Sequence, residues 1–293
     1  MDKTYRQYSF VKATYSKDST NLAFYEYPNG DVVKGTGGIR ISEKDTNPVE
    51  YRLRKAKNDA STLNRRTRKI HELMRNNFTP DNCIFVTLTY DPILLDQTCC
   101  QTFTAKQSAQ SWHTLSQDEQ EDFTLKVVKK DFQNYIRTLK YYYENIAYLG
   151  IIERQQNDTP HIHFVINILD DEILQDKWVH GVTDARSTFD IGGLAKYFCK
   201  QMKYSKPRSH AILNSQHLKQ SVSVCNWNSE EDYRTVKNTL NELHRQTPDR
   251  VHSCFNLITK GLVYETYNNH NDFFDAVPVA TRKPSASPPV ISS

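Results

Sequence analysis

Two histidines separated by one residue, His161 and His163, are the first feature of this sequence that could do chemistry. They lie in a run of apolar and β-branched residues, 161–169, that is typical of a β-strand. Because alternate residues of a strand point to the same face, both imidazoles should project from one side while Ile162 points into the core. Two nitrogens arranged in this way can converge on one divalent ion.

An acidic residue is well placed to be a third ligand. The apolar segment 147–153 ends at Glu153, and the turn-forming sequence 157–160 follows it, so residues 147–169 are predicted to form a β-hairpin. Residues that flank a short turn are cross-strand neighbours, and Glu153 can therefore reach the ion bound by the histidines. Two nitrogens and a carboxylate suit Mg²⁺ or Mn²⁺ in use, although Zn²⁺ or Ni²⁺ can bind such a set more tightly in vitro.

A tyrosine and a lysine with helical spacing follow downstream. Apolar residues recur at helical intervals over 191–204, and Tyr197 and Lys200 differ by three positions, which places them on one helix face. A tyrosine beside a metal-polarised phosphate can act as a nucleophile, and a nearby ammonium can stabilise that phosphate. Taken singly, such a pair is usually an ordinary amphipathic pair, and a His-x-His pair often arises by chance.

Several further elements would position these residues. Residues 50–76 are predicted to form a basic helix, 83–90 a buried strand, 117–144 a long amphipathic helix with a capping box at Ser116 and Glu119, and 229–246 another helix. We expect a hairpin around 24–33, strands at 255–258 and 262–267, and a loop insertion at 91–115. The tail 277–293, which contains four of the eleven prolines, is predicted to be disordered.

Positive charge is unevenly distributed along the chain. The formal net charge is only +4, but nine basic residues lie between Glu50 and Arg75 against three acidic ones. A second basic group consists of Lys196, Lys200, Lys203, Lys206 and Arg208. Clusters of this kind suit a polyanion such as DNA or RNA, and a solvated helix face is the alternative interpretation of either one.

Other classes of protein have little support in the sequence. No apolar run approaches the roughly 20 residues needed to cross a bilayer, and the N-terminus lacks the apolar stretch of a secretory signal. The six cysteines include no CxxC pair, so we expect reduced thiols and no zinc ribbon. The chain has no Gly-Lys-Ser/Thr phosphate-binding loop, which argues against a helicase domain. We therefore expect a cytoplasmic protein that acts in a host cell, bacterial by preference.

Taken together, the motifs resemble the HUH endonuclease superfamily, specifically the single-tyrosine replication initiators of small phages, plasmids and single-stranded DNA viruses. The similar segments, which span roughly 80–220, are Phe85–Tyr90, Trp178–Gly181, Pro160–Phe164 with Glu153 ahead of it, and Tyr197–Lys200. Many relatives have a tyrosine directly after the lysine, whereas Gln201 stands there in this chain. Tyr204, two helical turns after Tyr197, leaves a two-tyrosine mechanism open.

This resemblance implies an α+β fold with an antiparallel central β-sheet flanked by helices, as in HUH and RRM-like nicking domains. It also implies a metal-dependent nicking and joining endonuclease that starts rolling-circle DNA replication. A Mg²⁺ or Mn²⁺ ion held by His161, His163 and Glu153 would bind the scissile phosphate. Tyr197, assisted by Lys200, would form a 5′-phosphotyrosyl bond and leave a free 3′-hydroxyl.

The resemblance also suggests partners and a domain plan. The expected partners are single-stranded DNA at a replication origin, a host helicase and a host polymerase, with a homodimer left open and no membrane. The residues expected to bind DNA are Arg65, Arg66, Arg68, Lys69, Lys203 and Lys206. The expected segments are 1–79 (strands and basic helix), 80–215 (nicking domain), 216–276 (C-terminal extension) and 277–293 (tail).

Three alternatives to a replication initiator stay open. A relaxase would place its tyrosine near the N-terminus, where Tyr5 and Tyr8 are candidates, and a single-tyrosine transposase would usually be shorter. A non-catalytic DNA-binding regulator of replication would be expected to have lost part of the site. A protein with chance motifs is the third alternative.

Overall fold

The computed structural model describes residues 10–26, 47–105, 111–154, 159–202, 212–226, 229–243, 245–254, 261–269, 271 and 276–284. Antiparallel sheets flanked by helices give a mixed α+β fold, which confirms the expected class. The chain divides into two compact units, one made of 1–60 and 219–275, the other of 61–218 and 276–293. This division differs from the segments expected from the sequence, because the N-terminal strands pair with strands from the C-terminal part of the chain.

The second unit is built on a five-stranded antiparallel sheet in the order β7-β3-β6-β5-β8. Its strands are β3 (Ile84–Leu88), β5 (Tyr148–Arg154), β6 (Pro160–Ile166), β7 (Thr183–Ser187) and β8 (Ile212–Asn214). The predicted hairpin is formed by β5 and β6, whereas the turn between them lies outside the described residues. This hairpin brings the expected ligands into the middle of the sheet.

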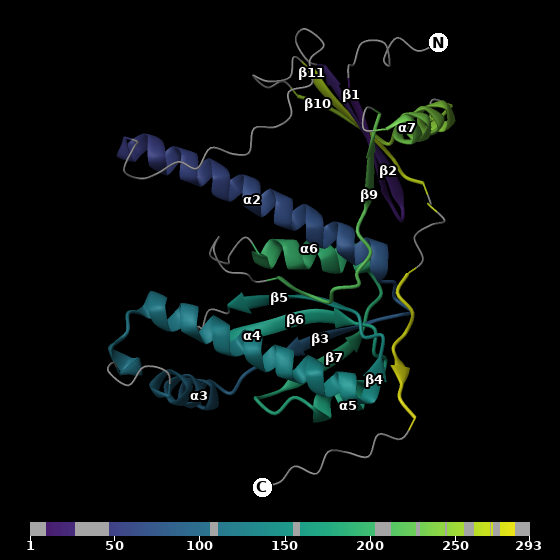
Figure 1. The fold of residues 1–293 in the computed structure, drawn as a ribbon. Helices are drawn as coiled ribbons and strands as arrows, with labels where there is room; N and C mark the ends of the chain where they lie inside the picture. Colours follow the sequence, from purple (N-terminus) through teal and green to yellow (C-terminus); the bar gives the residue numbers. More distant parts are fainter. Residues whose placement is uncertain are drawn as a thin grey trace. The chain divides into compact units, whose positions relative to one another are not determined.

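Helices cover both faces of this sheet (Figure 1). They are α2 (Pro48–Asn77), α3 (Pro92–Thr104), α4 (Gln117–Tyr142), α5 (Asp171–Asp176) and α6 (Ile191–Met202). One face packs against α4 and α3 in a core that includes Phe132, Phe103 and Phe164. The opposite face packs against α6 and the C-terminal half of α2 in a second core that includes Ile70 and Phe198. Both cores follow from the apolar stripes predicted for these helices.

Residues 91–115, expected to be a loop, contain a helix in the structure. Asp91 accepts hydrogen bonds from the backbone N–H groups of Ile93 and Leu94 at the start of α3, and Pro92 occupies the first turn. An aspartate cap followed by proline is a favourable helix start, and the buried Leu95, Cys99 and Phe103 fix α3 on the core. The short 3₁₀ turn Trp112–Thr114 follows this helix.

The C-terminal segment also differs from the prediction, because residues 276–284 are ordered. The Val277 N–H donates to Asn77 O, the Ala280 N–H donates to Asn167 O, and β12 (Thr281–Arg282) pairs with β4 (Tyr143–Glu144). Proline-rich composition predicts that a segment cannot build its own core, but here the backbone is held by hydrogen bonds to other elements. Residues 285–293 of the expected tail lie outside the described residues.

The first unit has its own five-stranded antiparallel sheet, in the order β10-β11-β2-β1-β9, with one helix. Its elements are β1 (Phe10–Ser16), β2 (Ser19–Glu26), β9 (Val222–Cys225), α7 (Glu230–Leu243), β10 (Arg250–Cys254) and β11 (Gly261–Tyr267). The core between α7 and the sheet includes Phe24, Val236 and Leu240. The hairpin expected around 24–33 and the strand expected at 255–258 fall largely or wholly on residues outside the described part.

In the part of the chain that the structure describes, no helix combines the length and apolar character required to span a bilayer.

Candidate active site

The candidate site lies on the face of the second unit's sheet that α6 covers. His163 on β6 pairs with Thr87 on β3 and with Ile151 on β5, while His161 pairs with Glu153. The alternation of β6 places both histidines on this face and Ile162 in the opposite core, as predicted. The site therefore collects residues from three neighbouring strands.

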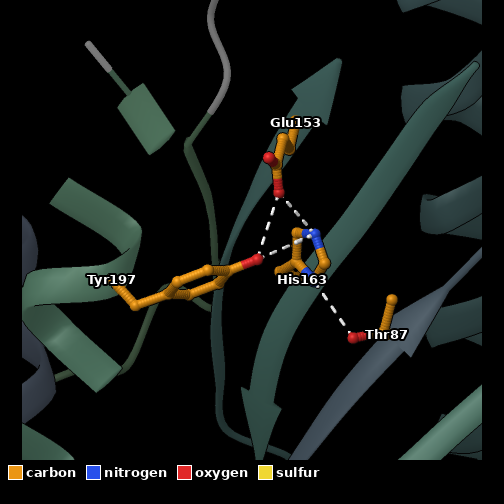
Figure 2. A network of polar contacts seen from close by, with 4 residues as sticks. All are labelled: Thr87, Glu153, His163 and Tyr197. Atoms are coloured by element: carbon orange, nitrogen blue, oxygen red, sulfur yellow. Dashed lines mark hydrogen bonds and ion pairs between the residues drawn. The ribbon is translucent and has the colours of Figure 1, made fainter. Parts of the chain in front are cut away.

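His163 is held by contacts on both ring nitrogens (Figure 2). Its Nε2 lies 2.7 Å from Glu153 Oε2, and its Nδ1 lies 3.0 Å from Thr87 Oγ1. The residue is 6% exposed and its ring stacks on Phe85, with 6.0 Å between ring centroids. Since the Thr87 hydroxyl can donate or accept, it can support His163 in either neutral tautomer.

The phenolic oxygen of Tyr197 meets this pair from α6 (Figure 2). The Tyr197 hydroxyl donates to Glu153 Oε2 at 3.2 Å and lies 3.4 Å from His163 Nε2. Helix α6 is fixed by Ala195 and Phe198, which are fully buried against the sheet. With the helix held in this way, Tyr197 projects over the end of β5 and the start of β6.

Burial dominates the proton affinities in the site. It raises the pKa of Tyr197 to about 12, and the negative charge of Glu153 contributes to the same shift. Burial, together with the charge of His161, lowers the pKa of His163 to about 4. The pKa of His161 is also lowered by burial, and Glu153 opposes that shift. At neutral pH the site therefore contains a protonated tyrosine and neutral imidazoles, the form in which histidine binds metals.

The donor atoms fit a divalent metal in their chemistry. Glu153 Oε2 and His163 Nε2 are in contact, and the His161 ring lies on the same face with its centroid 6.1 Å from that of His163. A carboxylate with imidazoles is a donor set that Mn²⁺ accepts. Among the described residues, however, no three His, Cys, Asp or Glu side chains are already arranged around one point as metal ligands. His161 would therefore have to turn toward the pair to complete the set.

Two contributors to the site were not singled out from the sequence, Thr87 and Phe85. Both lie in the strand segment that resembles the family's first motif, but nothing in that segment alone marks a partner for His163. The available signal was the alternation of β3, which places Phe85 and Thr87 on one face and Val86 and Leu88 on the other. A polar residue on the face that also contains the histidines was the clue.

We expect Thr87→Val to weaken Mn²⁺ binding about 10–100-fold, because outer-shell partners of metal-binding histidines typically have effects of that size. Valine keeps the shape of threonine and removes the hydroxyl that orients His163. The measurement is isothermal titration of the full chain with Mn²⁺. Thr87→Ser, which keeps the hydroxyl, is the matched control and should bind nearly as the wild type does. Equal affinity of the valine and serine variants would show that Thr87 has no orienting role.

The other predicted site residues are only partly placed by the structure. Lys200 is exposed on α6, three residues after Tyr197. On α2, Arg65, Arg68 and Lys69 are exposed and Arg66 is half-buried. Lys203, Lys206 and the alternative nucleophile Tyr204 lie outside the described residues.

The segment Trp178–Gly181 has a structural role beside the end of β3. Trp178 is buried, and its indole N–H donates to Thr89 O at 2.8 Å. The Asp91 N–H donates to His180 O, which extends the pairing of β3 with the chain before β7. A Cβ atom at Gly181 would lie 2.3 Å from Thr89 O, so only glycine allows this close approach. The segment therefore fixes the strand that contains Thr87.

Comparison with known proteins gives one match. Residues 83–206, somewhat under half of the chain, match the model of a family of replication-associated proteins, the ORF2 type. The matched region includes all the site residues described above, from Phe85 to Lys200. No curated protein and no solved structure matches the chain. The family match supports a role in the initiation of replication.

Proposed function

We propose that this protein initiates rolling-circle DNA replication by nicking one DNA strand with Tyr197 and remaining attached to its 5′ end. The observation that supports this most directly is the position of the Tyr197 hydroxyl, 3.2 Å from Glu153 and 3.4 Å from His163. A tyrosine oxygen beside a carboxylate and an imidazole is the arrangement that such a transesterification needs. The family match over 83–206 supports the same proposal.

The proposed step exchanges one phosphoester for another. The Tyr197 oxygen attacks the scissile phosphorus in line, a bond from that oxygen to phosphorus forms, and the bond from phosphorus to the 3′ oxygen breaks. Tyr197 gives up its phenolic proton, first to the carboxylate of Glu153 that already accepts its hydrogen bond, and the departing 3′ oxygen gains a proton. Because no water is consumed, the reverse reaction at the same site rejoins the strand.

His161, His163 and Glu153 would hold a divalent metal, Mg²⁺ or Mn²⁺, which would supply positive charge to the scissile phosphate. Thr87 would orient His163 from the rear of the ring. Lys200, exposed one helical turn after Tyr197, would bind a non-bridging oxygen of the same phosphate. Arg65, Arg66, Arg68 and Lys69 of α2, with Lys203 and Lys206, would contact the backbone of single-stranded DNA at the origin. A host helicase and polymerase would then extend the free 3′-hydroxyl.

The experiment that tests this function is incubation of the full chain with a pool of single-stranded oligonucleotides in Mn²⁺ or in EDTA, analysed on a denaturing protein gel. We expect a band of reduced mobility in Mn²⁺ only, because the phosphotyrosyl bond survives denaturation. Complete absence of that band, with DNA binding retained, would contradict the nicking function and favour a non-catalytic regulator of replication.

The histidines should differ from an unrelated surface histidine in this assay. We expect His163→Gln and His161→Gln to lower formation of the covalent product at limiting Mn²⁺ by at least about tenfold, since each removes one proposed ligand. His113→Gln, at an exposed histidine outside the site, is the control and should leave the product unchanged. Identical Mn²⁺ dependence of the wild type and the His163 variant would rule out His163 as a ligand.

A further inference from the structure

Helices α2 and α6 lie side by side on the face of the sheet that contains the site. The Cys199 thiol donates to Thr67 O at 3.4 Å, and Ile70 and Met74 of α2 share a core with Phe198 of α6. These contacts fix which flank of each helix borders the other. The flank of α2 next to α6 begins at Thr67, and the flank of α6 next to α2 begins at Cys199.

Basic residues follow the line along which these two helices meet. At 3.6 residues per turn, the α2 positions beside the Thr67 flank are 64, 68, 71 and 75, and the outer positions beside Cys199 on α6 are 196 and 200. These positions are occupied by Asn64, Arg68, His71, Arg75, Lys196 and Lys200. The one carboxylate in this half of α2, Glu72, projects about 100° around the helix from His71. The line where the helices meet is therefore cationic and free of acidic positions.

The electrostatic interactions confirm that cations of the two helices lie close together. Burial lowers the pKa of His71, and the positive charges of Arg75 and Lys196 lower it further. Lys196 thus acts across the helix pair on a residue of α2. Arg68, Arg75 and Lys196 are exposed, and neither Arg68 nor Lys196 forms an ion pair with a carboxylate of the described chain. A site of this charge and exposure suits an anion that comes from solvent.

We propose that Arg68, His71, Arg75 and Lys196, the α2–α6 seam, bind the phosphate backbone of single-stranded DNA and direct the strand over the outer face of α6 to Tyr197. The identity of this ligand rests on the proposed function. Lys200 continues the line of Lys196 by one helical turn and lies on the same flank as Tyr197, so the seam leads toward the nucleophile. The extended charge also matches a strand better than it matches a single phosphate ion.

The direct test compares two double variants of the full chain. Arg75→Gln/Lys196→Gln removes two charges from the seam, and Lys126→Gln/Lys130→Gln removes two exposed charges from α4 on the opposite face of the sheet. Affinity for a fluorescent 20-nucleotide single strand is measured by anisotropy across a salt series. We expect the seam variant to bind roughly tenfold more weakly at low salt and its log–log salt slope to become about 1.4 less steep, at about 0.7 per lost contact. The α4 variant should match the wild type.

A second measurement follows His71 itself. The imidazole signal, identified by its loss in His71→Gln, is titrated by NMR with and without the oligonucleotide. Bound phosphates would offset Arg75 and Lys196, so the pKa of His71 should rise when DNA binds. A wild-type salt slope in the seam variant, or an unchanged His71 titration at saturating DNA, would overturn the seam even where the covalent product forms. A weakened slope without any covalent product would leave the seam intact and refute the nicking function.

Discussion

Tyr197→Phe should abolish the covalent protein–DNA product, with a loss of at least about a thousandfold, because it removes the atom that would form the bond to phosphorus. Phenylalanine retains the ring that lies edge-on to Phe85 at 6.2 Å and to His163 at 5.5 Å, so the packing of α6 should persist. The lost interactions are the hydroxyl contacts with Glu153 and His163. The measurement is the amount of covalent product on a denaturing gel, with affinity for single-stranded DNA determined in parallel.

Two further tyrosine variants make this result specific. Tyr141→Phe removes a hydroxyl from an exposed position on α4 and should leave the product at its wild-type level. Tyr204→Phe tests the second tyrosine of the two-tyrosine alternative. If Tyr204→Phe eliminated the product while Tyr197→Phe preserved it, the nucleophile would be Tyr204 and the proposed role of Tyr197 would be wrong.

The second large effect concerns stability. We expect Phe164→Ala to lower the free energy of unfolding by about 3–5 kcal/mol, because it empties a fully buried position in the core under α4. Phe164 packs edge-on against Phe132 at 5.2 Å, and it faces Gly150, where a Cβ atom would lie 2.4 Å from Phe164 Cβ. Because Phe164 follows His163 directly on β6, its loss should also loosen the strand that positions the site.

The stability measurement is urea denaturation followed by tryptophan fluorescence. Phe189→Ala is the matched control, since Phe189 is 89% exposed and surface substitutions usually change stability by less than about 0.5 kcal/mol. Similar denaturation midpoints for the two variants would mean that Phe164 does not support the core as its burial indicates.

Local sequence patterns were sufficient for the individual elements of the site. The alternation of His161 and His163 within an apolar segment predicted that both lie on one strand face, and the structure confirms it. The helical spacing of apolar residues over 191–204 predicted the helix that contains Tyr197, again as observed. Each of these predictions depends on the period of one strand or helix, which neighbouring residues set by themselves.

Local patterns were insufficient where distant segments determine the structure. Residues 91–115 were predicted to be a loop, yet the cap at Asp91 and the burial of Phe103 against a distant helix produce α3. The C-terminal residues 276–284 are ordered by hydrogen bonds to Asn77 and Asn167 that no local pattern announces. The first unit joins strands more than 200 residues apart, such as β1 and β9.

The sequence by itself therefore determined which residue types are available for chemistry and on which strand or helix each lies. Only the tertiary structure decided that they meet. The Tyr197 oxygen reaches His163 across 34 residues of chain, and Thr87 reaches it across 76. The physical reason is that these distances depend on strand order and on the packing of α6 over the sheet, and both are set by the burial of apolar surface between segments remote in the chain.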